Sequence, residues 1–102
     1  MSLIVPIRTT DLGPGTPGKV APERLLAGNP DTQTWAHDQS LGGKVDIGVW
    51  EITPSENRSV KDGICEFCHI LEGVVELTSE EGESWTFRKG DSFVMKPGFR
   101  GT

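Results

Sequence analysis

The sequence has no surplus of positive charge and no long apolar segment. Its 10 Lys and Arg residues against 15 Asp and Glu residues give a formal charge of −5. A basic face is needed to offset the repulsion of phosphates, so this balance argues against a nucleic-acid partner. No apolar run approaches the ~20 residues of a membrane helix, and the apolar start Leu3–Ile7 is too short for a signal-peptide core. We therefore expect a cytoplasmic protein without a membrane partner.

Cysteine and histidine are also scarce, with two of each in 102 residues. Cys65, Cys68 and His69 spell C-x-x-C-H, a string found at haem attachment sites and in part at zinc ribbons and thiol redox pairs. Haem attachment needs an export signal, a zinc site needs two further ligands nearby, and a redox pair needs a helix N-terminus. We find none of these contexts in the sequence. Because residues i and i+3 of a strand face opposite sides, we interpret the cysteines as two small, half-buried thiols.

Turn-forming residues are abundant, with 13 glycines and 7 prolines. They favour many turns over long helices. From Lys44 onward apolar residues recur with a period of two, which is typical of short strands. The pattern predicts strands at 45–52, 64–71, 74–78, 83–87 and 93–95, with turns at 79–82, 89–91 and 96–98. The polar segment 53–62 is expected to be a loop, and 32–39 is ambiguous.

The N-terminal part reads differently. Residues 1–20 contain the breaker-rich run Gly13–Gly18 and predict an arm or edge strand, with a short strand at Leu3–Ile7. Residues Ala21–Gly28 can form one helical turn, with Pro22 early and Gly28 as a stop.

Several motifs, in order along residues 21–102, resemble the small single-domain cupins related to the cupin domain of ureidoglycine aminohydrolases and to the ethanolamine-utilisation cupins. The motifs are Glu23-Arg24-Leu25-Leu26-Ala27-Gly28-Asn29-Pro30, Trp35, Gly48-Val49-Trp50-Glu51, Glu66-Phe67-Cys68-His69-Ile70-Leu71-Glu72-Gly73 and Gly90-Asp91-Ser92-Phe93-Val94-Met95-Lys96-Pro97-Gly98-Phe99-Arg100-Gly101-Thr102. The resemblance implies an all-β fold, a cupin-type double-stranded β-helix (jelly-roll) barrel over 21–102. Such proteins normally continue past Gly-Thr into a further strand. Either that strand lies beyond this sequence, or another chain covers the unpaired edge; a homodimer is the expectation.

The resemblance also implies where a metal would be held. The first cupin block normally supplies two histidines one residue apart and then a glutamate, and the second block supplies one more histidine. Gly73 places the glutamate at Glu66, and Gly98 places the last histidine position at Gly101. The first two positions fall at Val60 and Asp62, or at Ser59 and Lys61. Since divalent transition metals favour imidazole nitrogen, we expect no metal and no other cofactor.

The candidate site residues follow from this placement. Strand alternation puts Glu66 and Cys68 on one face, so Glu66 is the candidate general acid or base, and Glu66, Cys68, Trp50 and Arg100 are the candidate ligand-binding residues. We expect a barrel that binds a small polar metabolite, of unknown specific activity. The alternative is an enzyme of small nitrogenous metabolites that uses Glu66 as acid or base, with or without a divalent metal.

Overall fold

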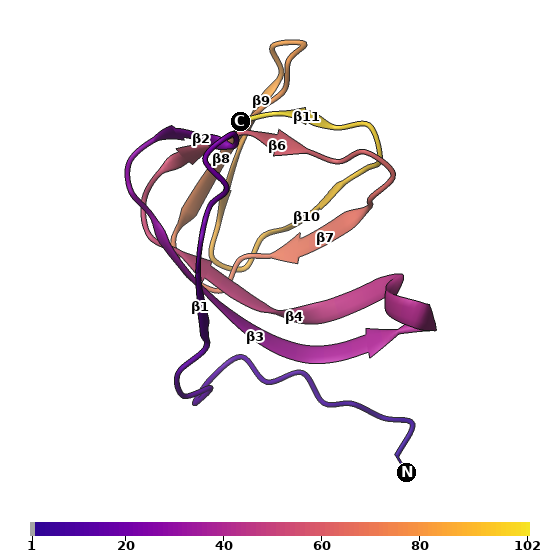
Figure 1. Cartoon of the computed structure of the whole chain (residues 1–102). Helices are drawn as coiled ribbons and strands as arrows, with labels where there is room; N and C mark the ends of the chain where they lie inside the picture. The colour runs from indigo at the N-terminus through magenta and orange to yellow at the C-terminus, as the bar shows by residue number, and fades with distance from the viewer. Residues whose placement is uncertain (1) are drawn as a thin grey trace. The chain divides into compact units, whose positions relative to one another are not determined.

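The computed structural model describes residues 2–102, and within them the regular elements are strands and one three-residue 3-10 helix (Figure 1). The elements are β1 (Thr16–Lys19), β2 (Leu25–Ala27), β3 (Asp31–Ser40), η1 (Leu41–Gly43), β4 (Val45–Ile52), β5 (Glu56–Asn57), β6 (Ser59–Val60), β7 (Glu66–His69), β8 (Val74–Thr78), β9 (Ser84–Arg88), β10 (Ser92–Met95) and β11 (Arg100–Gly101). The expected all-β class is confirmed. Two compact units are present: unit 1 holds residues 2–22 and Gly28–Ser55, and unit 2 holds Glu23–Ala27 and Glu56–Thr102.

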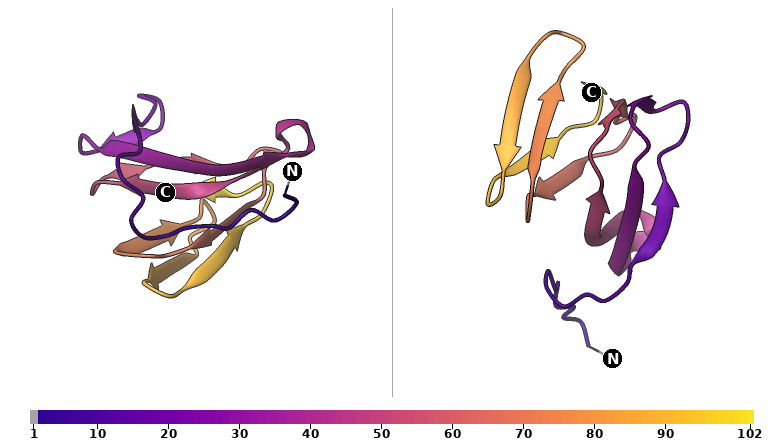
Figure 2. Two further views of the ribbon diagram at one scale, coloured as in Figure 1. Left: turned by 90° about the horizontal axis from the view of Figure 1, so that it is seen from below. Right: turned by 90° about the vertical axis from the view of Figure 1, so that its left-hand side faces the viewer.

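Unit 1 is built on the long antiparallel hairpin of β3 and β4, and β1 pairs with the other edge of β3 (Figure 2). The strand predicted at 45–52 is confirmed as β4, and the ambiguous segment 32–39 belongs to β3. The two strands approach closely at Gly48, where a Cβ would lie 2.5 Å from the carbonyl oxygen of Trp35. A glycine is therefore required here by the neighbouring strand, beside the bulge between Ala36 and Asp38.

The N-terminal arm differs from its prediction. The strand expected at Leu3–Ile7 is absent, and a strand forms instead at β1, inside the breaker-rich run. A strand needs a partner for its backbone groups: β1 has β3, whereas Leu3–Ile7 pairs with none of the described residues. Pro17 is tolerated in β1 because this is an edge strand, where a missing N–H faces away from the ladder.

The predicted helical turn at 21–28 is wrong beyond Arg24. A turn occupies residues 22–24, and Leu25–Ala27 then forms β2. The reason is a partner distant in sequence: β2 pairs with β5, and the Arg58 N–H donates to the Arg24 carbonyl oxygen at 2.6 Å. Because of this pairing, residues 56–57 also form a strand, although the segment 53–62 was expected to be a loop.

Unit 2 contains four two-stranded antiparallel ladders, which join β2 to β5, β6 to β11, β7 to β10 and β8 to β9. The predicted turn at 79–82 is confirmed, since the Gly82 N–H donates to the Ser79 carbonyl oxygen at 3.0 Å and Gly82 has a φ of 91°. The strand predicted at 64–71 is shorter than expected and spans Glu66–His69. Strands β6 and β11 were not predicted, because each is two residues long and depends on the other.

One face of unit 2 is apolar. Phe87 of β9 stacks on Phe93 of β10, with ring centroids 4.2 Å apart and an interplanar angle of 17°. Met95, on the same face of β10 two residues later, is only 8% exposed. This face carries the candidate site.

Candidate functional site

Strand β7 presents Glu66 and Cys68 on one face, as its alternation predicts. In the β7–β10 ladder Glu66 lies opposite Met95, and Cys68 lies opposite Phe93. These four side chains are buried or half-buried, whereas Phe67, which lies between Glu66 and Cys68 on the chain, is 69% exposed. The predicted shared face of Glu66 and Cys68 is confirmed by their contact, because the Cys68 thiol donates to Glu66 Oε1 at 3.2 Å.

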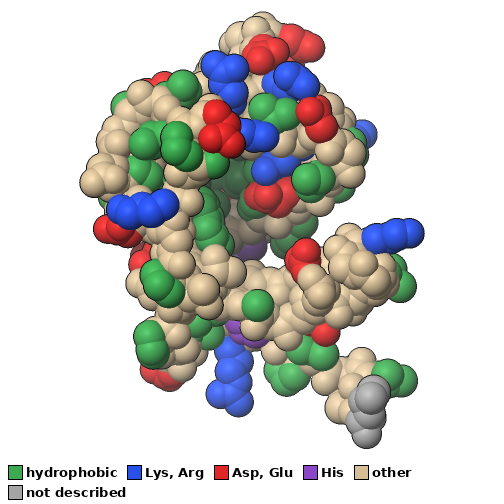
Figure 3. Space-filling model, in the orientation of Figure 1, with side chains coloured by type: hydrophobic (Ala, Val, Ile, Leu, Met, Phe, Trp, Pro, Cys, Tyr) green, Lys and Arg blue, Asp and Glu red, His purple; other side chains and the backbone are tan. Residues whose placement is uncertain are grey.

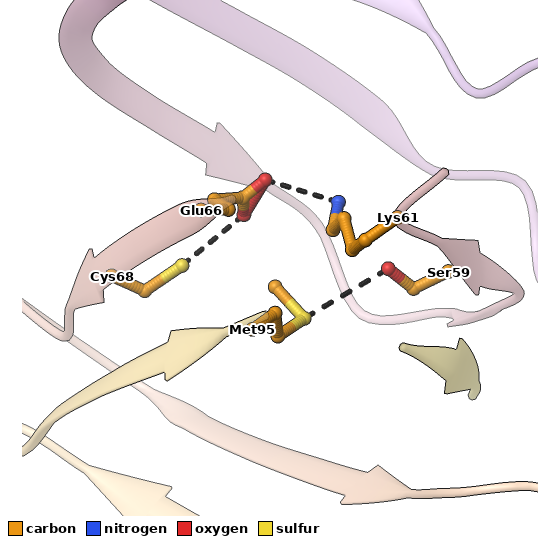
Figure 4. A network of polar contacts seen from close by, with 5 residues as sticks. All are labelled: Ser59, Lys61, Glu66, Cys68 and Met95. Carbon is orange, nitrogen blue, oxygen red and sulfur yellow. Dashed lines mark hydrogen bonds and ion pairs between the residues drawn. The ribbon is translucent and has the colours of Figure 1, made fainter. Parts of the chain in front are cut away.

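Lys61 completes this group from the loop that follows β6. Its Nζ lies 3.0 Å from Glu66 Oε2 (Figure 4), and its side chain is only 17% exposed, against 43% for Glu66. The backbone fixes its position, since the Lys61 N–H donates to the Phe99 carbonyl oxygen at 2.9 Å and the Lys61 carbonyl accepts from the Gly98 N–H at 2.7 Å. The loop between β10 and β11 therefore holds the ammonium against the carboxylate.

Ser59 and Met95 border the same group. The Ser59 hydroxyl lies 3.9 Å from Met95 Sδ, a long contact that places Ser59 on the face of Lys61 and Glu66 (Figure 4). Met95 also lines a hollow of about 670 Å³ in unit 2, together with Phe87 and Phe93. Charged side chains, among them Glu80, Glu83 and Lys96, line the same hollow. We call the polar group the Lys61–Glu66–Cys68 cluster; none of these three residues lines the hollow.

The cluster keeps the Cys68 thiol protonated. Burial is the main reason that the pKa of Cys68 rises to about 12, and the hydrogen bond to Glu66 and the negative charge of that carboxylate raise it further. The Lys61 ammonium acts in the opposite direction with a smaller effect. Cys68 is therefore a hydrogen-bond donor at neutral pH, and its thiolate is scarce.

The comparison with protein families identifies the chain. A model of the EutQ-like cupin domain matches residues 39–102, which is more than half of the sequence. The chain belongs to the EutQ-like cupin family. No curated protein matches it in sequence.

The cupin resemblance left two registers open for the first two metal-ligand positions, and the structure favours one of them. Ser59 and Lys61 share the face of Glu66, whereas Asp62 lies outside the cluster and binds the Arg100 guanidinium at 3.0 and 3.2 Å. The cupin domain thus carries a serine and a lysine on the side of Glu66. Within residues 2–102 no group of three or more His, Cys, Asp or Glu side chains is arranged to hold a metal ion.

The fourth metal-ligand position is Gly101. On this backbone it cannot carry any side chain. A Cβ built there would overlap the carbonyl oxygen of Thr78 and would lie 2.9 Å from the Phe99 ring. The close approach arises because Thr102 and Thr78 exchange two backbone hydrogen bonds, each of 2.9 Å. A histidine at position 101 would therefore require the strands to separate.

The other two predicted ligand-binding residues, Arg100 and Trp50, have surroundings of their own. Arg100 projects from the other face of β11 onto Asp62, and both side chains are exposed. Trp50 belongs to β4 of unit 1, is 59% exposed, and borders a hollow of about 620 Å³ above Ala36 and Gly48. None of the helices in the described part of the chain is long and apolar enough to cross a membrane.

Sequence reasoning did not assign Lys61 a role. The residue lies in a polar segment without periodicity, and its pairing with Glu66 depends on the β6–β11 ladder, whose strands are far apart in sequence. One signal in the sequence could have indicated Lys61. In one of the two registers, Ser59 and Lys61 occupy the positions of the first two metal-binding histidines.

Proposed function

We propose that this cupin binds a small polar metabolite at the Lys61–Glu66–Cys68 cluster, without the usual metal-binding histidines and without a resident metal. The observation that supports this most strongly is the ion pair between Lys61 and Glu66 on the half-buried face of unit 2. A carboxylate at a metal site is normally compensated by the cation. Here the lysine ammonium compensates the charge of Glu66, so the protein needs no metal for that purpose.

The cluster offers both kinds of hydrogen-bonding group to a ligand. The Lys61 ammonium has three N–H donors, of which the bond to Glu66 uses one. A carboxylate has about four lone-pair sites, and Lys61 and Cys68 together occupy two of those on Glu66. A ligand with an acceptor and a donor can therefore bind without breaking the ion pair.

The same contacts leave catalysis open, because a lone pair of Glu66 that accepts a ligand's donor is also placed to take its proton. The enzyme hypothesis with Glu66 as acid or base remains the second candidate. It predicts that Glu66→Gln abolishes turnover of a substrate while the protein stays folded.

The proposal is tested in two steps on the full chain purified without chelator. Native mass spectrometry measures bound metal and co-purified small molecules, and thermal shift with calorimetry then measures binding of polar metabolites. We expect no stoichiometric metal, and affinities at least about tenfold lower in Lys61→Met and Glu66→Gln than in the parent protein.

Lys89→Met is the matched control, because Lys89 forms an exposed 3.0 Å ion pair with Glu72 that resembles the Lys61–Glu66 pair in charge and length. It should bind ligand as the parent does. A stoichiometric transition metal would contradict the metal-free assignment. A ligand that binds equally well to the Lys61 and Glu66 variants would contradict the assigned site.

A further inference from the structure

Hydrogen bonds hold the N-terminal arm on β3 within unit 1 (Figure 1). Residues 2–15, which we call the arm, precede β1. Trp35 Nε1–H donates to the Gly13 carbonyl oxygen at 3.0 Å, and the Arg8 N–H donates to His37 Nε2 at 3.2 Å. Among the hydrogen bonds between the described part of the arm and β3, the one at Arg8 lies farthest from β1. It therefore controls how much of the arm follows the strand.

Beyond Arg8 the arm carries exposed aliphatic side chains. Leu3, Ile4, Val5 and Ile7 are between 45% and 92% exposed, and Figure 3 shows hydrophobic side chains at the end of the arm. A segment with little buried apolar surface opens at a low cost in free energy. The hydrogen bond at Arg8 thus has a large share in keeping this part of the arm in place.

His37 reaches the arm because it is the extra residue of the bulge in β3. Ala36 pairs with Gly48 and Asp38 pairs with Ile47, so His37 lies opposite no residue of β4. A bulge leaves its extra residue unpaired and changes the direction of that side chain. The half-buried imidazole is therefore free to bind the arm instead of packing on the ladder.

The two contacts of His37 define one tautomer of its ring. Nδ1 lies 2.9 Å from the Trp35 carbonyl oxygen, which can only accept, so Nδ1 carries the proton. In the neutral ring Nε2 then has a lone pair, which accepts the Arg8 N–H. A second proton would go to Nε2 and would turn this acceptor into a donor that faces another donor. The bond to Arg8 therefore requires a neutral His37.

Charged residues lie around His37 on both strands of the hairpin and on the arm. Asp38 of β3 and Asp46 of β4 line the same hollow as His37, and their carboxylates can compensate the charge of an imidazolium. The arm contributes Arg8 and Asp11. The remaining charged residues of β1, β3 and β4 pair toward the other end of the sheet; they are Lys19, Asp31 and Glu51.

We propose that His37 is a pH-sensitive latch for the N-terminal arm. While His37 is neutral, the arm lies along β3 as it does in the structure. When His37 takes up one proton in mildly acidic solution, the bond to Arg8 is lost and the arm detaches as far as Gly13, where Trp35 still holds it. Imidazole is the side chain that changes charge between about pH 5 and 8, so the latch opens within that range.

The first test measures the mobility of the arm against pH. A nitroxide spin label is attached at Thr10→Cys in a Cys65→Ser background, which removes the exposed thiol. The mobile component of the EPR spectrum should grow at least about twofold between about pH 8 and about pH 5. Equal spectra at the two pH values would overturn the latch. A loss of the β-sheet circular dichroism over the same range would overturn it too, because the latch acts in the folded protein.

Variants of the two histidines test which group titrates. His37→Gln keeps an acceptor that does not titrate, so the arm should stay attached at every pH in the range. His37→Phe removes the acceptor, and the arm should be mobile throughout. His69→Gln removes the other histidine, which lies in unit 2, and should respond as the parent does. A pH response in His37→Gln, a fixed arm in His37→Phe, or a lost response in His69→Gln would refute the role of His37.

The second test observes the tautomer directly. Two-bond ¹⁵N–¹H correlation spectra of the histidine rings, recorded at about pH 8, show which nitrogen carries the proton. We expect the proton of His37 on Nδ1, and a second proton on Nε2 in acid at the same midpoint as the change in arm mobility. A neutral ring with its proton on Nε2, or two midpoints that differ, would separate the titration of His37 from the release of the arm.

Discussion

Cys65 and Cys68 are three residues apart, yet their environments differ sharply. Cys65 is exposed, and Cys68 is half-buried against Glu66. The sequence predicted two separate, half-buried thiols. This is confirmed for Cys68 and wrong for Cys65, which precedes β7 and is exposed. The two thiols should also differ in reactivity, because the contact of Cys68 with a carboxylate disfavours its thiolate.

Alkylation at pH 8 should therefore distinguish the two cysteines. We expect iodoacetamide to label Cys65 at least about tenfold faster than Cys68, because the thiolate is the reactive species. Peptide mass spectrometry over a time course measures both rates in one sample. Equal rates in the folded protein, with the same equality in urea, would show that Cys68 is not protected.

The same thiol should make the protein less stable at alkaline pH. The pKa of Cys68 lies at about 12 in the folded state, against an ordinary value of 9.0. Above pH 9 the unfolded chain loses this proton while the folded chain keeps it, so stability falls as the pH rises from 9 toward 12. Urea unfolding across this range should show a shallower decline for Cys68→Ala than for the parent. A Cys65→Ser control should keep the steeper decline.

Lys61 and Glu66 contribute unequally to stability, because they are buried unequally. Glu66→Gln leaves a largely buried ammonium without its carboxylate and should cost about 1–2 kcal/mol. Lys61→Met leaves a more exposed carboxylate and should cost about 1 kcal/mol or less. Urea titration of both single variants and the double variant measures the coupling between them. Lys89→Met, in the exposed pair, should change the free energy of unfolding by less than about 0.5 kcal/mol. Equal losses of stability in Lys61→Met and Lys89→Met would show that the buried pair is no stronger than the exposed one.

At the scale of elements, the sequence was most informative where the partners are neighbours. The β8–β9 hairpin follows from alternation around Gly82, and strand β4 follows from the period of two at Val45, Ile47 and Val49. Strands β2, β5, β6 and β11 were missed. Each is two or three residues long, and its backbone is extended only because a distant segment accepts its hydrogen bonds.

Gly101 tests this dependence on distant partners. Gly101→Ala should destabilise the protein by about 3 kcal/mol or more, because the added Cβ meets the backbone of Thr78, which cannot rotate away. Gly63→Ala is the comparison: it has open space around it and a φ of 68°, so only backbone strain of about 1 kcal/mol is expected. Chemical denaturation of both variants measures the difference, and an alanine at position 101 that costs no more than the one at position 63 would contradict the close approach.

At the scale of the whole molecule, two properties are established: the family and the net charge. The chain is an all-β cupin with a formal charge of −5. Family membership defines the fold more closely than the activity, because one fold carries many chemistries. The two units contain different candidate residues, with Trp50 in unit 1 and the Lys61–Glu66–Cys68 cluster in unit 2. The proposed binding function concerns the cluster, where Glu66 contacts both Lys61 and Cys68.

If the cupin holds no metal, a chelator should not change its thermal stability. We expect the melting temperature to change by less than about 1 °C after dialysis against EDTA, since ligand loss lowers stability only when a ligand was bound. Differential scanning calorimetry before and after dialysis measures this. A lower melting temperature that Mn²⁺, Ni²⁺ or Zn²⁺ restores would show that metal binding contributes to folding.

The sequence by itself determined the β class, the cupin resemblance, and the common face of Glu66 and Cys68, because strand periodicity and glycine turns are local properties. Only the tertiary structure brought Lys61 to Glu66, chose Ser59 and Lys61 over Val60 and Asp62, and closed position 101 to side chains. The closure of position 101 depends on the pairing of Thr78 with Thr102, and the other two features depend on the ladder between β6 and β11. Its strands lie about forty residues apart, beyond the reach of any local pattern.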